Sequence, residues 1–241
     1  IAKHGQLTYG SRELDILERL YDAEINFADD QLGFLLQRLW RANILDNTIV
    51  IVTSDHGESF GENNEIGHGS ALYSQQIHVP MIIRYPARVE RGVKSNRLIE
   101  ASTQILPTVL DLVGLPIPPG RYRLSIMADD QTWSAEEDRA FSETAMPGIP
   151  QYSFQNPTWK TIAPLIEQTL NPKQAKLFNP HVDWGDQHNL TPDHPDIVEY
   201  YLHDRLEPYL ELETTNRQPG GVKVRLSPAD IEQLRSLGYI Q

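Results

Sequence analysis

The feature that most constrains this sequence is an apolar run, Ile49–Thr53, which ends abruptly on Ser-Asp-His-Gly-Glu. Consecutive residues of high β propensity predict a strand that is buried on both faces. The pair Asp55 and His56 would then lie at the carboxyl end of this strand, where ligands bind in open α/β sheets. An isolated Asp-His-Gly also fits a plain polar turn, so the pair alone does not decide between a turn and a site.

Asp55 and His56 are candidate metal ligands, because a carboxylate followed by an imidazole offers one oxygen and one nitrogen from a rigid support. The polar loop that follows, Glu58–Gly69, is rich in glycine around His68. Loops of this kind carry functional residues more often than packing residues. A solvated loop histidine is the ordinary alternative for His68.

Composition narrows the classes of partner. The chain has 241 residues, enough for one large domain or two smaller ones. A formal charge of -12 argues against nucleic acid and anionic membrane surfaces as partners. An acidic chain that binds an anion needs a local positive charge, most simply a metal. The absence of cysteine excludes a cysteine nucleophile within this chain, and no apolar run approaches the ~18 residues that span a bilayer.

The N-terminal part reads as an α/β layer. Helical periodicity predicts a long helix from Ser11, as its cap, to about Ala42, with a break near residues 21–26. A second buried strand is expected at Met81–Tyr85 and a helix at Gln104–Val113. Together with the strand at 49–53, this order predicts an α/β fold with a mainly parallel central sheet flanked by helices.

A proline-rich stretch at 115–120 predicts a boundary between a catalytic α/β domain at 1–114 and a small C-terminal α+β subdomain at 115–241. The elements expected beyond it are short antiparallel strands at Ala140–Ser142, Trp159–Ile162 and Ala175–Phe178, a helix from about 193 to Leu210, a polar loop over 214–227 and a tail helix from Ser227 to Gly238.

The segment Tyr21–Gly114 resembles the C-terminal half of a sulfatase catalytic domain, within the alkaline phosphatase superfamily. The resemblance rests on an ordered series of motifs: Tyr-Asp-Ala-Glu-Ile at 21–25, Thr-Ser-Asp-His-Gly-Glu at 53–58, Gly-His-Gly at 67–69, Val-Pro-Met-Ile-Ile-Arg-Tyr-Pro at 79–86 and Pro-Thr at 107–108. Lys176-Leu177-Phe178, Asp186 and Asn189-Leu190 are similar to the family's terminal subdomain, as is the tail at 234–240.

The resemblance implies metal-dependent hydrolysis of a sulfate ester. Asp55 and His56 match the family's second pair of metal ligands, and His68 matches the position that contacts sulfate and donates a proton toward the leaving group. The expected metal is Ca²⁺, while the nitrogen ligand leaves Mg²⁺, Mn²⁺ and Zn²⁺ open. Gln104 replaces an aspartate of many members, which is expected to affect local capping rather than chemistry.

The resemblance also implies that part of the machinery lies elsewhere. In the family the formylglycine nucleophile and the first acidic metal ligands precede everything present here. Since the sequence starts at Ile1 without an initiator Met, we interpret it as the C-terminal part of a longer protein, incomplete and inactive alone, whose partner is the N-terminal half. A periplasmic, extracellular or lysosome-like location is implied, although no signal peptide is visible.

Two alternatives stay open. The same superfamily contains phosphodiesterases, phosphonate monoesterases and phosphoglycerol transferases, in which Asp-His also occurs on this strand. A non-catalytic binding module with the same fold would bind no metal at Asp55 and His56. The substrate is expected to be a sulfated small molecule or a sulfated glycan, and the residues do not choose between them.

Overall fold

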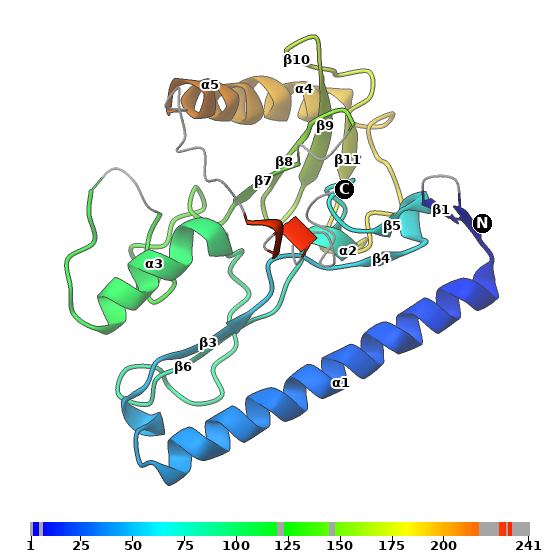
Figure 1. Ribbon diagram of the computed structural model, residues 1–241. Helices are drawn as coiled ribbons and strands as arrows, with labels where there is room; N and C mark the ends of the chain where they lie inside the picture. The colour runs from blue at the N-terminus through cyan, green and yellow to red at the C-terminus, as the bar shows by residue number, and fades with distance from the viewer. Residues whose placement is uncertain are drawn as a thin grey trace. The chain divides into compact units, whose positions relative to one another are not determined.

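The computed structural model describes residues 2–4, 7–119, 123–144, 148–216, 227–229 and 231–232 (Figure 1). The helices are α1 (Ser11–Arg41), α2 (Ser74–Ile77), α3 (Ala101–Leu112), α4 (Pro195–Tyr201) and α5 (Glu207–Asn216), with 3-10 turns at Leu45–Asn47 and Glu62–Asn64 and a π-helical segment at Leu202–Leu206. The strands are β1 (Ala2–His4), β2 (Leu7–Tyr9), β3 (Val50–Thr53), β4 (Ser59–Phe60), β5 (Ile66–Gly67), β6 (Met81–Arg84), β7 (Ala140–Thr144), β8 (Gln151–Gln155), β9 (Lys160–Ile166), β10 (Thr169–Leu170) and β11 (Lys176–Phe178).

Helix α1 confirms the predicted long helix, but it runs unbroken for 31 residues. The expected break is therefore wrong. The cap is also one residue earlier than predicted, because Gly10 is the N-cap and its backbone N–H donates to the Glu13 carboxylate at 3.0 Å. A glutamate at the third helical position often satisfies a free donor of this kind. No side chain of α1 is buried, and apolar residues such as Phe27 and Phe34 are exposed.

The strand pair β3–β6 corrects two predictions, the parallel direction of the strands and the burial of β3 on both faces. The two strands exist where they were expected, but they pair antiparallel, with Ile51 opposite Ile83. A parallel arrangement is therefore wrong for these two strands. Sheets that are otherwise parallel commonly contain an antiparallel strand. The residues of β3 are only partly buried and Thr53 is exposed, because β6 is the one strand that pairs with β3 in the part of the chain that the structure describes.

The C-terminal part contains the predicted antiparallel sheet. Its strands pair in the order β10-β9-β8-β7, and β11 also pairs with β9. Central strand β8 was not predicted, although its sequence Gln-Tyr-Ser-Phe-Gln alternates polar and aromatic residues. Helix α4 packs against this sheet: the Tyr201 ring lies 5.0 Å from that of Phe154, and the Asn156 amide donates to the Tyr201 hydroxyl at 2.9 Å.

Helix α3 begins at Ala101 with Glu100 as N-cap, slightly before the predicted start, and Gly114 after it has a φ of 73°. A left-handed residue just after a helix is a common way to end it. Gln104 is fully buried; its amide oxygen accepts from the Glu100 N–H at 2.7 Å and its amide nitrogen donates to the Leu124 carbonyl. These contacts fit the local capping predicted for Gln104.

The structure forms two compact units, Ile1–Leu206 and Glu207–Gln241. In the second unit α5 extends to Asn216, so the polar loop begins later than the predicted residue 214. Most of the predicted tail helix lies outside the described residues. The boundary predicted between 114 and 115 stays a prediction. None of the helices described is long and apolar enough to cross a membrane.

Candidate active site

The turn after β3 presents the two predicted metal ligands. The Ser54 hydroxyl donates to the His56 carbonyl at 2.7 Å, and the His56 backbone N–H donates to Asp55 Oδ1 at 3.0 Å. These local bonds close the turn at the strand end, where β pairing stops. They place Asp55 with its side chain 65% exposed and His56 partly buried beside it.

The His56 ring fits a metal ligand by its hydrogen bonds. Nδ1 lies 2.9 Å from the Gly57 carbonyl, so a proton on Nδ1 donates to that oxygen and leaves the Nε2 lone pair available. Nε2 lies 3.8 Å from Asp55 Oδ1. Ligand atoms that are each about 2.0–2.6 Å from one ion lie within about 5 Å of each other. Asp55 and His56 therefore fit a shared divalent cation without rearrangement of the turn.

His68 comes from the far end of the loop and meets His56. The two rings stack with centroids 3.7 Å apart and an interplanar angle of 22°. His68 Nδ1 lies 3.0 Å from Glu58 Oε2, so the carboxylate orients the ring and leaves Nε2 to face another group. The structure thus brings together all three predicted site residues and adds Glu58, which sequence reasoning missed although it directly follows Asp-His-Gly.

A second set of cation ligands overlaps the first. Donor atoms of His56, Glu58 and His68 all lie within 4.8 Å of one another. An ion held by these three residues would take electron density from the Glu58 carboxylate and the His68 ring, which now share a hydrogen bond. The two sets have His56 in common, so they are alternatives for one ion rather than two independent sites.

The loop around these side chains needs glycine at defined positions. A Cβ on Gly57 would lie 2.1 Å from the Gln75 carbonyl oxygen, and the Gly57 N–H donates to the Gln76 carbonyl at 2.7 Å. The chain between His56 and Glu58 therefore runs directly against α2. Gly67 and Gly69, on either side of His68, have φ values of 82° and 81°, a region that glycine adopts without steric cost.

Gln76 connects α2 to the loop. Its side chain is 2% exposed; the amide nitrogen donates to the Ser59 hydroxyl at 3.1 Å and the amide oxygen accepts from the Ala71 N–H at 3.3 Å. Ser59 is the residue after Glu58. The position of Glu58 is thus set by a buried side chain of α2 as well as by the local backbone.

A buried charged cluster holds α2 in place. Asp186 Oδ2 accepts from the Lys160 ammonium at 2.5 Å, from the Ser74 N–H at 2.7 Å and from the Ser74 hydroxyl at 2.9 Å. Lys160 is 0% exposed and Asp186 is 1% exposed. Burial lowers the pKa of Lys160 from its ordinary value, and Asp186 opposes this shift. The cluster joins β9 and the turn around Asp186 to the first residue of α2.

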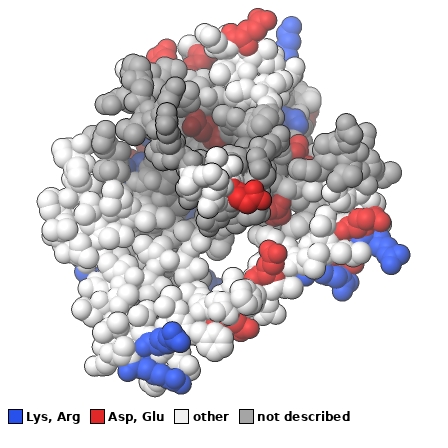
Figure 2. Space-filling model, viewed as in Figure 1, with Lys and Arg blue, Asp and Glu red and all other residues white. Residues whose placement is uncertain are grey.

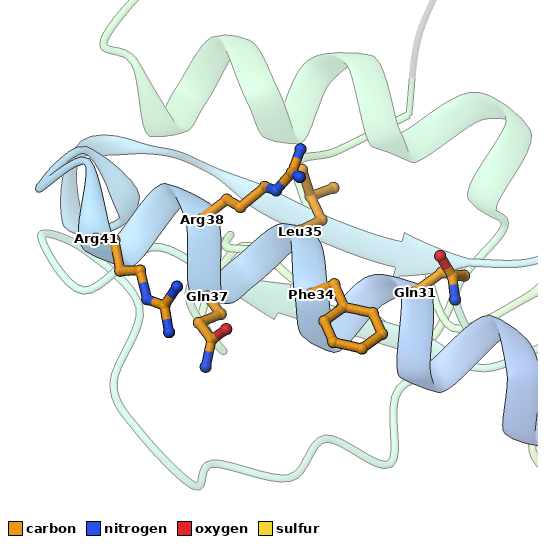
Figure 3. Close-up of a pocket in the computed structure, with 6 residues that line it drawn as sticks. All are labelled: Gln31, Phe34, Leu35, Gln37, Arg38 and Arg41. Atoms are coloured by element: carbon orange, nitrogen blue, oxygen red, sulfur yellow. The ribbon is translucent and has the colours of Figure 1, made fainter.

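A surface hollow on α1 is lined by Gln31, Phe34, Leu35, Gln37, Arg38 and Arg41. Figure 3 shows that all six side chains come from this one helix, which cannot enclose a ligand by itself. None of the predicted site residues lines it. On the face drawn in Figure 2, acidic and basic side chains are dispersed in several places, so charge alone does not mark a binding site there.

Comparison with known proteins finds similarity to sulfatases. Residues 16–115 match the family model described as Sulfatase. Arylsulfatase K of Rattus norvegicus is 28% identical over 212 residues, which cover 82% of this chain and 36% of the relative. The chain therefore spans about a third of the length of this curated relative.

Two solved structures share the fold. A protein of Bacteroides thetaiotaomicron VPI-5482 that has been assigned as a sulfatase aligns with a TM-score of 0.74 at 18% identity, over 92% of this chain and 48% of that one. Another structure, in complex with its substrate D-glucosamine-2-N,6-O-disulfate, aligns with a TM-score of 0.64 at 22% identity, over 78% of this chain and 39% of that one.

The mixed α/β arrangement of this chain is therefore the alkaline phosphatase-like fold of these sulfatase structures, which confirms the predicted fold class. Over residues 16–115 the chain is similar to the sulfatase family, and its similarity to the arylsulfatase extends over most of the chain. The motifs at 53–58 and 67–69 lie inside this matched segment.

Proposed function

We propose that the intact protein is a metal-dependent sulfatase that hydrolyses a sulfate ester at the site around His56. The observation that carries this proposal is the convergence of Asp55, His56, Glu58 and His68 within a segment that matches the sulfatase family. An oxygen and nitrogen ligand pair, next to an imidazole that a carboxylate orients, suits the binding and cleavage of an anionic ester.

Each residue has a definite role in this proposal. Asp55 and His56 hold the divalent cation, which we expect to be Ca²⁺, with Mg²⁺, Mn²⁺ and Zn²⁺ as the alternatives. When bound, such a cation supplies Lewis acidity toward the oxygens of the ester. His68 contacts the sulfate through Nε2 and donates a proton toward the departing alcohol oxygen, while Glu58 holds the ring in that orientation.

The rest of the machinery is proposed to lie in an N-terminal part of the same protein. The nucleophile would be a formylglycine there, close to the first acidic metal ligands. The exposed apolar surface of α1 supports a covering partner, since large exposed apolar patches usually mark an interface. Its exposed apolar side chains include Ile16, Leu20, Phe27, Phe34 and Leu35, the last two being part of the hollow in Figure 3.

Three further parts of the proposal concern domain organisation, substrate and location. We propose that 1–114 completes the catalytic domain and that 115–241 is its C-terminal subdomain. The proposed substrate is a sulfated glycan, because a structure with the same fold has been solved with a sulfated amino sugar, D-glucosamine-2-N,6-O-disulfate, as its substrate, and such sugars are units of sulfated glycans. A periplasmic, extracellular or lysosome-like compartment agrees with such a substrate.

The test is a comparison of ester classes with the intact protein. Initial rates on 4-nitrophenyl sulfate and on bis(4-nitrophenyl) phosphate are measured with Ca²⁺ and after treatment with a chelator. Faster, chelator-sensitive turnover of the sulfate supports the proposal, and His68→Ala should lower it by about 100-fold or more. Faster turnover of the phosphodiester, or no heat on calorimetric titration with Ca²⁺ or Mn²⁺, would overturn it in favour of phosphoryl chemistry or of a non-catalytic module.

A further inference from the structure

The turn at 179–188 exposes two apolar side chains at its surface. Trp184 is 69% exposed and Val182 is 78% exposed. An indole is among the most apolar side chains, and exposing most of it to water gives up stabilisation that burial would supply. Nothing in the proposed chemistry uses Trp184.

The turn that carries Trp184 is rigidly built. The Asp183 carboxylate accepts from the Gln187 N–H at 3.0 Å and from the His188 N–H at 2.7 Å, while the Asp183 N–H donates to the Asn179 carbonyl at 2.9 Å. Two residues after Trp184, the buried Asp186 side chain enters its cluster with Lys160. A side chain displayed on such a support loses little conformational freedom when it binds a ligand.

The same turn is bonded to the loop of the candidate active site. The Gly185 carbonyl accepts from the Gln75 side-chain amide at 2.9 Å and from the Asn63 amide at 3.4 Å. Gln75 contributes the carbonyl against which Gly57 packs. Asn63 belongs to the connection between β4 and β5, and His68 directly follows β5. Trp184 therefore directly precedes Gly185, the residue through which the turn contacts the active-site loop.

The size and chemistry of the patch indicate a small ligand. A stable protein interface buries about 800 Å² on each partner, far more than two adjacent side chains provide. A sugar ring, by contrast, offers an apolar face the size of an indole, with hydroxyl groups at its edge. The same turn carries two polar side chains: Gln187, whose amide donates to the Gly185 carbonyl at 2.8 Å, and His188, which is 81% exposed.

We propose that Trp184 is a glycan-binding residue, on which a sugar ring of a sulfated oligosaccharide stacks next to the sulfated unit held at His68. This inference rests on the proposed function and deepens it, because it names a residue that binds a second sugar unit of the proposed glycan substrate. Trp184 touches a part of the substrate that does not react, so its contribution is to binding of long substrates and not to the chemical step.

The experiment compares Trp184→Ala with Val182→Ala, a matched control in the same turn, in the intact protein. Substrates are 4-nitrophenyl sulfate and a sulfated amino-sugar tetrasaccharide. We expect Trp184→Ala to raise KM for the tetrasaccharide by about tenfold at unchanged kcat, as loss of an aromatic contact implies. Turnover of 4-nitrophenyl sulfate should not change, Trp184→Phe should restore most of the affinity, and Val182→Ala should resemble the wild type.

Binding without turnover separates this inference from the proposed function. Quenching of tryptophan fluorescence by the tetrasaccharide is measured for the wild type and Trp184→Phe. A quench that disappears in Trp184→Phe supports the glycan contact even if no sulfate is released, a result that would refute the proposed function alone. Equal tetrasaccharide affinity in wild type and Trp184→Ala would overturn the inference. So would a fall of more than about 5 °C in the melting temperature of Trp184→Ala, which would mark Trp184 as a packing residue.

Discussion

Substitutions in the buried pair Lys160–Asp186 are the strongest test of how the site is supported. Lys160→Met keeps the length of the side chain but removes the ammonium, which leaves the Asp186 carboxylate buried with Ser74 as its remaining donor. Among the described residues, Asp186 Oδ1 already has no hydrogen-bond partner. Removing one member of a buried ion pair costs about 3–5 kcal/mol, because the remaining charge loses its compensation. In a protein of this size that free energy lowers the melting temperature by on the order of 10 °C.

A double-mutant cycle separates the pair from its surroundings. Asp186→Leu leaves the Lys160 ammonium without its carboxylate, while the combination of Lys160→Met and Asp186→Leu leaves no buried charge. Replacing a buried pair by apolar side chains is often close to neutral, so the double variant should lose less stability than either single variant. Chemical and thermal unfolding measure the four free energies of unfolding. Arg19→Met, at the exposed pair with Asp15, is the control and should leave the free energy of unfolding nearly unchanged.

The same variants report on the site. Because Asp186 holds the first residue of α2 and Gly57 packs against α2, Lys160→Met should also weaken Mn²⁺ binding in a calorimetric titration. Single losses below about 1 kcal/mol that add up in the double variant would refute the reasoning, since they would mean that the pair is not coupled. If Lys160→Met shows the whole predicted loss of stability but unchanged Mn²⁺ affinity, only the connection between this pair and Gly57 is refuted.

Three smaller perturbations address the loop, the imidazole pair and a surface ion pair. Gly57→Ala should abolish Mn²⁺ binding by calorimetry, because its Cβ would lie 2.1 Å from the Gln75 oxygen. Glu58→Gln should leave Mn²⁺ affinity within about twofold but lower kcat by about tenfold, if Glu58 orients the imidazole rather than binding metal. The hydrogen bonds from Arg205 lower the pKa of Glu136 below its ordinary value of 4.5. The stability that this ion pair contributes, less than about 1 kcal/mol, is therefore present above pH 4.5 and is lost as the pH falls through the lowered pKa. Arg205→Gln should remove this loss from acid unfolding curves.

Each of these has an outcome that contradicts it. Wild-type Mn²⁺ affinity in Gly57→Ala would mean that α2 moves away at little cost. A large loss of affinity in Glu58→Gln, matching that in Asp55→Asn, would assign the ion to the overlapping set of His56, Glu58 and His68. Identical acid unfolding curves for the wild type and Arg205→Gln would show that the exposed pair contributes nothing.

The predictable parts of this fold are those encoded by local pattern. The long helix at 11–41 and the strands at 50–53 and 81–84 carry strong periodicity or β propensity, and the structure has them within a few residues. Strand direction was not predictable in the same way. Whether β3 and β6 run parallel depends on where the chain between them travels. The loop at 58–69 and α2 return it to the end of the pair that it left, so that Met81 lies opposite Thr53.

The residues of the candidate site likewise divide into those that local pattern predicts and those that depend on distant contacts. Asp55 and His56 follow from a strand that ends on ionisable residues, and the family resemblance indicated His68. Glu58 was missed because its role depends on a contact with His68 ten residues away, which periodicity does not report. Lys160 was missed for a similar reason: it lies in a strand whose pattern suggests an exposed lysine, and only the distant Asp186 makes its burial possible.

The support of the site argues against treating the C-terminal part as an accessory. Asp55 and His56 depend on their own strand and turn, but Glu58 is positioned through Gln76 and α2, and α2 is held by groups from β9 and the turn around Asp186. The loop therefore has its geometry only when the antiparallel sheet has formed. A substitution in that sheet can impair the ester-binding side of the site more than it impairs the Asp-His turn. Metal affinity and turnover should then fall by different amounts, which is the result expected if two separate parts of the chain build one site.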